Sequence, residues 1–99
     1  MTVVHISRGG GMTQETYEQV SAEMGTEQDP PAGLIVHTAA DVDGAWQVID
    51  IWESVGAKER FEQDRLMPAI SALYGPEAAS LAANQPDSVM YEASHSLVP

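Results

Sequence analysis

The residues best suited to chemistry lie on one predicted β-hairpin, which covers residues 33–54. His37 and Asp50 provide an imidazole and a carboxylate, a pairing in which the carboxylate orients a histidine that acts as a general base. Both tryptophans of the chain, Trp46 and Trp52, lie on the second strand of the same hairpin. Large aromatic side chains around a polar pair are typical of a pocket for a small molecule.

The register of the hairpin decides whether these side chains share a face. Two apolar, β-branched runs flank residues 41–44, whose Asp and Gly residues favour a turn. With an even number of loop residues and Ala40 opposite Ala45, side chains alternate strictly between the two faces. One face then carries only the aliphatic side chains Leu34, Val36, Ile49 and Ile51. The other face carries Ile35, His37, Ala39, Trp46, Val48, Asp50 and Trp52.

Several of these residues have a second interpretation as packing residues. Each tryptophan buries on the order of 200 Å² and therefore also suits a core or an interface. An Asp50 carboxylate buried without a partner would cost several kcal/mol, so a backbone N–H or His37 must satisfy it. In the functional interpretation, Asp50 fixes the tautomer of His37 and increases its basicity. Tyr91 either donates a hydrogen bond into the cleft or places its hydroxyl in water. The remaining histidines, expected on outer strands of the sheet, are predicted to be structural or exposed: His5 and His95.

Composition limits the classes of partner. The chain has 99 residues, expected to form one domain over 1–99, and 43% of them are hydrophobic, which argues against disorder. A net charge of −11 disfavours nucleic acid and anionic membrane surfaces, and is consistent with a role in solubility. With no cysteine, no secretion signal and no long apolar run, the expected location is the cytoplasm. No metal-ligand spacing is present, and neither a metal nor a cofactor is expected.

The order of predicted elements is β-α-β-β-α-β. A strand over residues 3–7 precedes a helix between the N-cap Thr13 and the stop Gly25, and a second helix follows the hairpin from the N-cap Ser54. Pro68 predicts a kink or restart near Met67. A short helix over 75–81, a turn over 84–87 and a strand over 89–97 complete the chain.

This order predicts an α+β, ferredoxin-like fold with an antiparallel sheet and both helices on one side. Since both faces of the hairpin are apolar or aromatic, the face without helices must meet another surface. A second copy of the chain is the simplest partner, so the sequence predicts a homodimer.

The hairpin also resembles a known family. The segments GLIVH at 33–37, DGAW at 43–46 and VIDIWES at 48–54, followed by Phe61 and LMP at 66–68, are similar to the antibiotic biosynthesis monooxygenase-like proteins of the dimeric α/β-barrel superfamily. The resemblance covers the whole chain in element order. It implies a ferredoxin-like protomer whose sheet packs on that of its twin, with a cleft between sheet and helices. Some members of that family oxidise polyketide quinols with O2 and no cofactor, and others degrade haem.

The chain departs from the haem-degrading branch of this family. Those enzymes place a tryptophan where this chain has Phe61, an iron-binding histidine on the same helix and an asparagine on the first strand. Here no histidine lies between Ser54 and Gly75, and residues 3–7 contain no asparagine. The resemblance therefore favours the oxygenases over haem degradation.

Three functions are compatible with the sequence. The first is a cofactor-independent monooxygenase, in which His37, supported by Asp50, deprotonates a phenolic or quinol substrate that then reacts with O2. The substrate-binding side chains would be aromatic: Trp46, Trp52, Phe61 and Tyr91. The second is a non-catalytic binder of a small aromatic molecule, or an accessory subunit. The third is an isomerase or cyclase that uses the same base.

Overall fold

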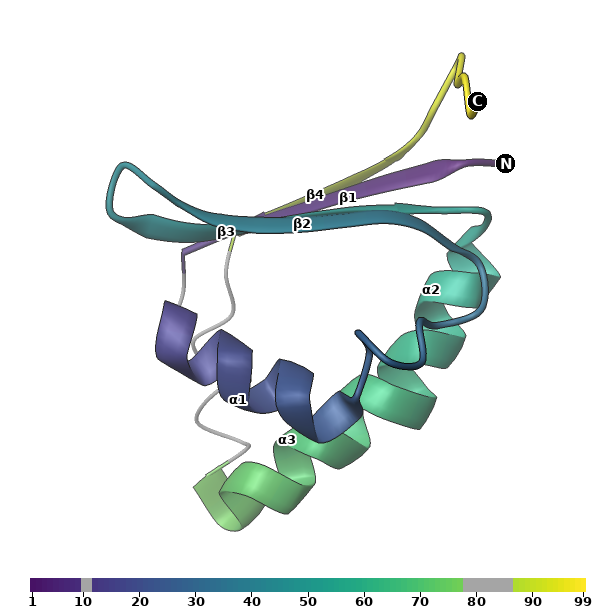
Figure 1. Cartoon of the computed structure of the whole chain (residues 1–99). Coiled ribbons are helices and arrows are strands. Elements are labelled where there is room, and N and C mark those ends of the chain that lie inside the picture. The colour runs from purple at the N-terminus through teal and green to yellow at the C-terminus, as the bar shows by residue number, and fades with distance from the viewer. Residues whose placement is uncertain (10–11, 78–86) are drawn as a thin grey trace.

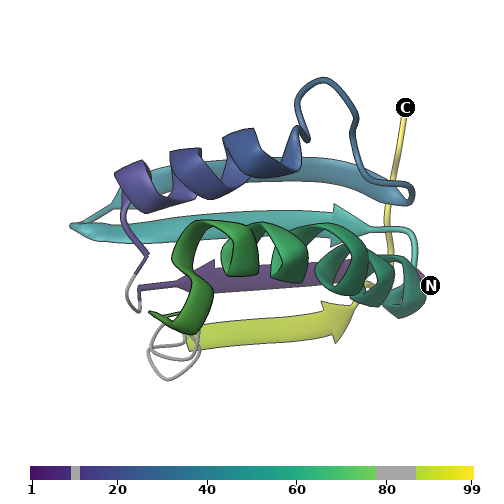
Figure 2. The same ribbon diagram turned by 90° about the horizontal axis from the view of Figure 1, so that it is seen from below.

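A four-stranded antiparallel sheet with helices on one face makes up the computed structural model, which describes residues 1–9, 12–77 and 87–99 (Figure 1). The strands follow the order β2-β3-β1-β4. The elements are β1 (Val3–Arg8), α1 (Gln14–Met24), β2 (Leu34–Val42), β3 (Ala45–Trp52), α2 (Val55–Phe61), a π-helical segment (Glu62–Leu66), α3 (Met67–Tyr74), a 3₁₀ turn (Gly75–Glu77) and β4 (Asp87–Glu92). The predicted ferredoxin-like α+β fold is confirmed. Figure 2 shows α1 running alongside α2 and α3 across the same face of the sheet.

The helix ends follow the predicted capping chemistry. The Thr13 hydroxyl accepts the N–H of Thr16 at 3.2 Å, and Gly25 ends α1 with a φ of 68°. Ser54 caps α2 by accepting the N–H of Ala57 at 3.1 Å. Pro68 lacks an N–H, and the preceding turn widens into the π-helical segment before α3 starts at Met67, as predicted.

The β2–β3 hairpin turns through only two residues, Asp43 and Gly44. Both have positive φ values, 52° and 84°, which is the geometry of a type I′ turn. The Asp41 side chain stabilises the turn by accepting the N–H of Gly44 at 3.0 Å. The predicted pairing of Ala40 with Ala45 is wrong, because Ala45 pairs with Val42. The loop is nevertheless even-numbered, so the predicted division of side chains between the two faces holds from Val36 onward.

One irregularity changes the pocket wall at the start of β2. The register shifts between Leu34 and Val36, so that Leu34 pairs with Trp52. Leu34 therefore lines the cavity in the place where strict alternation predicted Ile35.

The last strand is shorter than predicted and starts earlier. β1 begins at Val3, which pairs with Glu92, so the β1–β4 ladder ends there. Of the predicted residues 93–97, Ala93 still donates its N–H to the Thr2 carbonyl. Of the predicted short helix over 75–81, the described part is the 3₁₀ turn. Its remainder and residues 84–86 of the predicted turn lie outside the described residues.

The two faces of the sheet differ in what covers them. On the helix side the core is formed by Val3, Val20, Trp52, Ala57 and Ala69. The other face has no covering element among the described residues, and the register places on it Val4, Ile6, Val36, Ile49, Ile51, Val89 and Tyr91. Val36, Val89 and Tyr91 are 44%, 58% and 49% exposed. None of the described helices is both long and apolar enough to cross a bilayer.

Gly33 is a position where an added methyl group should be costly. Its φ is 87°, and a Cβ there would lie 2.5 Å from the Cβ of Ala57 on α2. Strained backbone and overpacking together predict that Gly33→Ala lowers the free energy of unfolding by about 2–5 kcal/mol. Gly44→Ala is the matched control, because its φ is 84° but its Cβ would meet open space. Urea unfolding that gives equal losses for both variants would contradict the packing part of this account.

Candidate functional site

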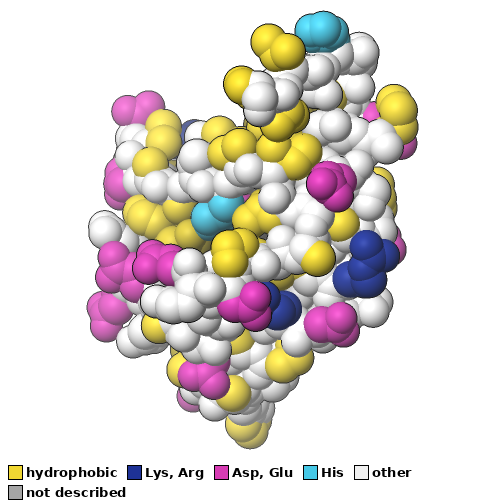
Figure 3. Space-filling view, turned by 45° about the vertical axis from the view of Figure 1, so that its right-hand side comes forward, with side chains coloured by type: hydrophobic (Ala, Val, Ile, Leu, Met, Phe, Trp, Pro, Cys, Tyr) yellow, Lys and Arg dark blue, Asp and Glu magenta, His cyan; other side chains and the backbone are white. Residues whose placement is uncertain are grey.

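A cavity of about 970 Å³ lies between the sheet and α1. Its floor comes from β2 and β3, and its walls come from α1, the 26–31 segment and Phe61 at the end of α2. Figure 3 shows a histidine among hydrophobic side chains on this side of the molecule, with acidic side chains nearby. The volume is sufficient for a small organic ligand of several rings.

His37 and Asp50 pair directly across the two strands, as their register requires. The Nδ1 atom of His37 is hydrogen-bonded to Oδ1 of Asp50, the only buried charged residue among those described. An ionised carboxylate only accepts, so Nδ1 carries the hydrogen and Nε2 keeps a lone pair. This arrangement favours the neutral tautomer in which Nε2, the nitrogen on the cavity side, is the acceptor.

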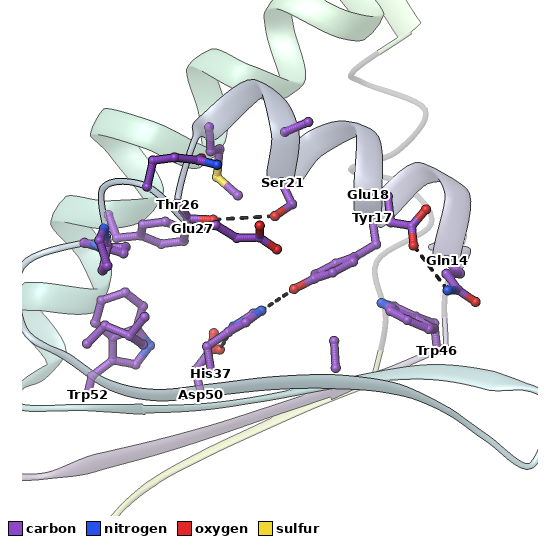
Figure 4. A pocket seen from close by; sticks show the side chains of 18 residues that line it. Gln14, Tyr17, Glu18, Ser21, Thr26, Glu27, His37, Trp46, Asp50 and Trp52 are labelled. Carbon is purple, nitrogen blue, oxygen red and sulfur yellow. Dashed lines mark hydrogen bonds and ion pairs between the residues drawn. The ribbon is translucent and has the colours of Figure 1, made fainter.

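Tyr17 completes a chain of three polar side chains. Its hydroxyl donates to Nε2 of His37, and the two rings are nearly parallel, with an angle of 8° between their planes (Figure 4). Burial raises the pKa of Tyr17 above its ordinary value, and the negative charges of Asp50 and Glu27 raise it further. The hydroxyl therefore stays protonated as a donor near neutral pH.

Sequence reasoning missed the role of Tyr17. In the sequence, Tyr17, Val20 and Met24 have the spacing of an apolar stripe on one helix face, and the structure has Tyr17 on the sheet-facing side of α1. Such a stripe does not show which residue of the sheet lies opposite Tyr17, because that depends on how α1 crosses the sheet.

The two tryptophans flank His37 along the cavity (Figure 4). Trp46 packs against Tyr17 with ring centroids 5.2 Å apart, and Trp52 packs against Phe61 at the same centroid distance. Trp52 is 1% exposed, so it belongs to the core as well as to the cavity wall. Both indole N–H groups are buried and have no hydrogen-bond partner among the described residues.

The structure does not bring Tyr91 to this cavity. Tyr91 pairs with Val4 on β1, which places it on the sheet face away from the helices. His5 lies on the helix side, opposite Asp50, but on an inner strand and not the expected outer one. Its pKa is lowered, first by burial and then by the charge of Lys58. His95 follows β4 and is exposed, as predicted.

The charged residues that line the cavity are all acidic. Glu18, Glu27 and Asp50 contribute carboxylates, whereas none of the lining residues is Lys or Arg. No group of three or more His, Asp or Glu side chains within the described ranges is arranged to hold a metal ion.

Comparison with known proteins identifies the fold. Neither a family model nor a curated protein matches the chain. SnoaB from Streptomyces nogalater, a cofactor-independent oxygenase, is similar with a TM-score of 0.60 and 20% identity over 97% of this chain and 96% of that chain. Rv0793 from Mycobacterium tuberculosis is similar with a TM-score of 0.69 and 9% identity over 99% of this chain and 100% of that chain. A Chloroflexus aurantiacus protein, whose name places it among the antibiotic biosynthesis monooxygenases, is similar with a TM-score of 0.65 and 12% identity over 99% and 98% of the two chains.

The chain has the fold of the antibiotic biosynthesis monooxygenase-like proteins. The predicted resemblance is thereby confirmed for the fold over nearly its full length. Identities of 9–20% concern the fold alone, so the roles of individual residues in the cavity of this chain rest on the geometry of that cavity.

Proposed function

We propose that this protein is a cofactor-independent oxygenase that acts on a phenolic or quinol substrate. The observation that carries the proposal is the hydrogen-bonded chain Tyr17–His37–Asp50, set between aromatic walls in a cavity. A histidine held in one tautomer by a carboxylate is a suitable general base for a phenol. SnoaB, which shares the fold, is a cofactor-independent oxygenase.

In the first step, the substrate hydroxyl takes the place of the Tyr17 hydroxyl at Nε2 of His37. The proton moves from the substrate oxygen to Nε2, and the resulting imidazolium is stabilised by the Asp50 carboxylate. Trp46 and Phe61 contact the flat ring and exclude water from the electron-rich anion. Tyr17, displaced from Nε2, is placed to donate its hydroxyl hydrogen to the new phenolate.

In the second step, a substrate ring carbon that lies para to the phenolate oxygen and carries a hydrogen forms a bond with O2. The resulting peroxide takes the proton back from His37, and the O–O bond then breaks as water leaves with the hydrogen of that ring carbon. The products are a para-quinone and one water. One oxygen atom enters the ring and the other enters water, and O2 accepts four electrons from the substrate.

Oxygen uptake tests this proposal. Phenols, 1-naphthol and anthrones with a hydrogen on the reacting ring carbon are supplied to the wild type, to His37→Ala and to His95→Ala, the last as a control at an exposed histidine. The wild type should consume O2 above the rate without protein, and His37→Ala should lose about a hundredfold or more of the catalysed rate. Equal uptake by the wild type and His37→Ala would overturn the assignment of His37 as the base.

One observation favours a second candidate, a non-catalytic binder. Tyr17 occupies the lone pair of His37 that a base would use. If this bond persists when a ligand enters, the same aromatic walls bind without proton transfer. Tight binding of a naphthol by the wild type without any oxygen uptake across the panel would select this function.

We also infer that the protein is a homodimer through the sheet face away from the helices. Val89 on this face is 58% exposed, and Met90, its neighbour on the same strand, is 50% exposed on the opposite face. Val89→Glu should convert the dimer to a monomer because it places a charge in an apolar interface, whereas Met90→Glu should leave it intact. Light scattering during size-exclusion chromatography measures the mass. A wild type that is monomeric at micromolar concentration would contradict the dimer.

A further inference from the structure

We infer that the cavity selects ligands without negative charge, so that its substrate is an uncharged or cationic aromatic molecule and not a carboxylic acid. This inference rests on the proposed function for the identity of the reacting hydroxyl, but its evidence is the charge and the walls of the cavity. It narrows the substrate to a chemical class.

The cavity contains negative charge and no matching positive charge. Its lining includes Glu18, Glu27 and Asp50, and the basic residues of the chain lie elsewhere. The chain has four Lys and Arg residues, and three of them are engaged by other groups: Arg8 donates to the Val42 carbonyl, Lys58 pairs with Glu62, and Arg65 donates to the Met24 carbonyl. A cleft lined by charges of one sign repels a ligand of that sign.

Glu27 adds to the charge of Asp50 in the cavity. Its carboxylate points into the cavity above Tyr17 and His37 (Figure 4), and its charge contributes to the raised pKa of Tyr17. Glu18 lies nearer the rim, where it accepts a hydrogen bond from Gln14 at 3.2 Å. A ligand carboxylate beside His37 would therefore face the charges of at least Asp50 and Glu27.

The walls of the cavity indicate what is accepted. Trp52 is 1% exposed, and its buried indole N–H lacks a partner among the described residues. An oxygen acceptor on the ligand would supply the partner that this donor lacks, and a neutral carbonyl or hydroxyl does so without adding negative charge near Asp50 and Glu27. The faces of Tyr17 and Trp46 also attract an ammonium group, with the Glu27 carboxylate nearby.

Selection of an uncharged substrate fits the proposed chemistry. The substrate enters as a neutral phenol, and negative charge appears on it only when its proton has moved to His37. The anion is then formed next to an imidazolium, so the charge of the cavity as a whole does not change. A substrate that carried its own carboxylate would gain no such compensation.

Matched ligands test this inference by calorimetric binding near neutral pH. The probes are three naphthols with a carboxamide, a carboxylate or an aminomethyl group at the same ring position. The wild type should bind the carboxylate at least about tenfold more weakly than the carboxamide, and the aminomethyl compound at least as tightly as the carboxamide. Raising the salt concentration should reduce these differences.

Variants identify the responsible charge. Glu27→Gln should reduce the preference for aminomethyl over carboxylate by about threefold or more, because the exposed carboxylate contributes a partly screened interaction. Glu15→Gln removes an equal charge from a position on α1 that does not line the cavity. This control variant should leave the preference unchanged.

The possible failures are distinguishable. The inference is overturned if the wild type binds the carboxylate as tightly as the carboxamide, if none of the three probes binds, or if Glu27→Gln and Glu15→Gln have equal effects. Binding with the expected preference but without oxygen uptake would overturn the proposed oxygenase and leave this inference standing. Oxygen uptake at equal rates with the carboxylate and the carboxamide would overturn this inference and leave the proposed oxygenase standing.

Discussion

Asp50→Asn is expected to lower turnover by about tenfold to a thousandfold while leaving the fold nearly intact. The carboxylate holds the hydrogen on Nδ1 of His37 and would stabilise the imidazolium that forms during proton transfer. An amide has no charge to stabilise an imidazolium, and its NH2 group can donate to Nδ1 and so favour the wrong tautomer. The loss should therefore appear in turnover more than in ligand binding.

Two measurements on this variant separate catalysis from structure. If Asp50 only satisfies a hydrogen bond in the sheet, Asp50→Asn should lower the Tm and leave activity per folded molecule unchanged. Asp43→Asn in the turn of the same hairpin is the matched control, because asparagine tolerates the positive φ of 52° found there. It should alter neither turnover nor ligand affinity.

Trp52→Ala is expected to lower the free energy of unfolding by about 3–5 kcal/mol. Trp52 is 1% exposed and packs against Phe61, so its removal leaves a cavity in the core. Trp46 is only half-buried, and Trp46→Ala should cost about 1–2 kcal/mol. Denaturant unfolding of both variants gives these values.

Ligand binding by the same two variants tests their different roles. Trp46→Ala should weaken the binding of a neutral naphthol by about tenfold or more, since Trp46 forms the cavity wall next to Tyr17. Equal destabilisation by both variants would contradict the distinction between a core tryptophan and a wall tryptophan.

Much of the hairpin was predictable because alternation and turn chemistry act locally. Two-residue and four-residue loops have the same parity, so His37 and Asp50 fall on one face in either case. For the same reason, parity alone could not distinguish the pairing of Ala45 with Ala40 from its pairing with Val42. The irregularity near Leu34 was not predictable, because no glycine or proline marks it within the strand.

Tertiary packing determines the contacts of Tyr17 and Tyr91, which local sequence patterns did not predict. Tyr17 reaches His37 only because α1 crosses the sheet at that point. Tyr91 alternates with its neighbours as predicted, but both sheet faces carry apolar residues, and only the pairing with Val4 shows on which face it lies. Contacts between elements far apart in sequence therefore determined which aromatic residues reach the cavity.

The most direct test of the central claim is the protonation state of a phenol bound in the cavity. An uncharged nitrophenol is added at a pH below its own pKa, and its absorption spectrum reports the phenol and phenolate forms separately. The wild type should shift the bound probe toward phenolate, because His37 takes the proton, and His37→Ala should bind it as the neutral phenol. A bound probe that shows the same spectrum in both proteins would contradict the account of His37 as the base.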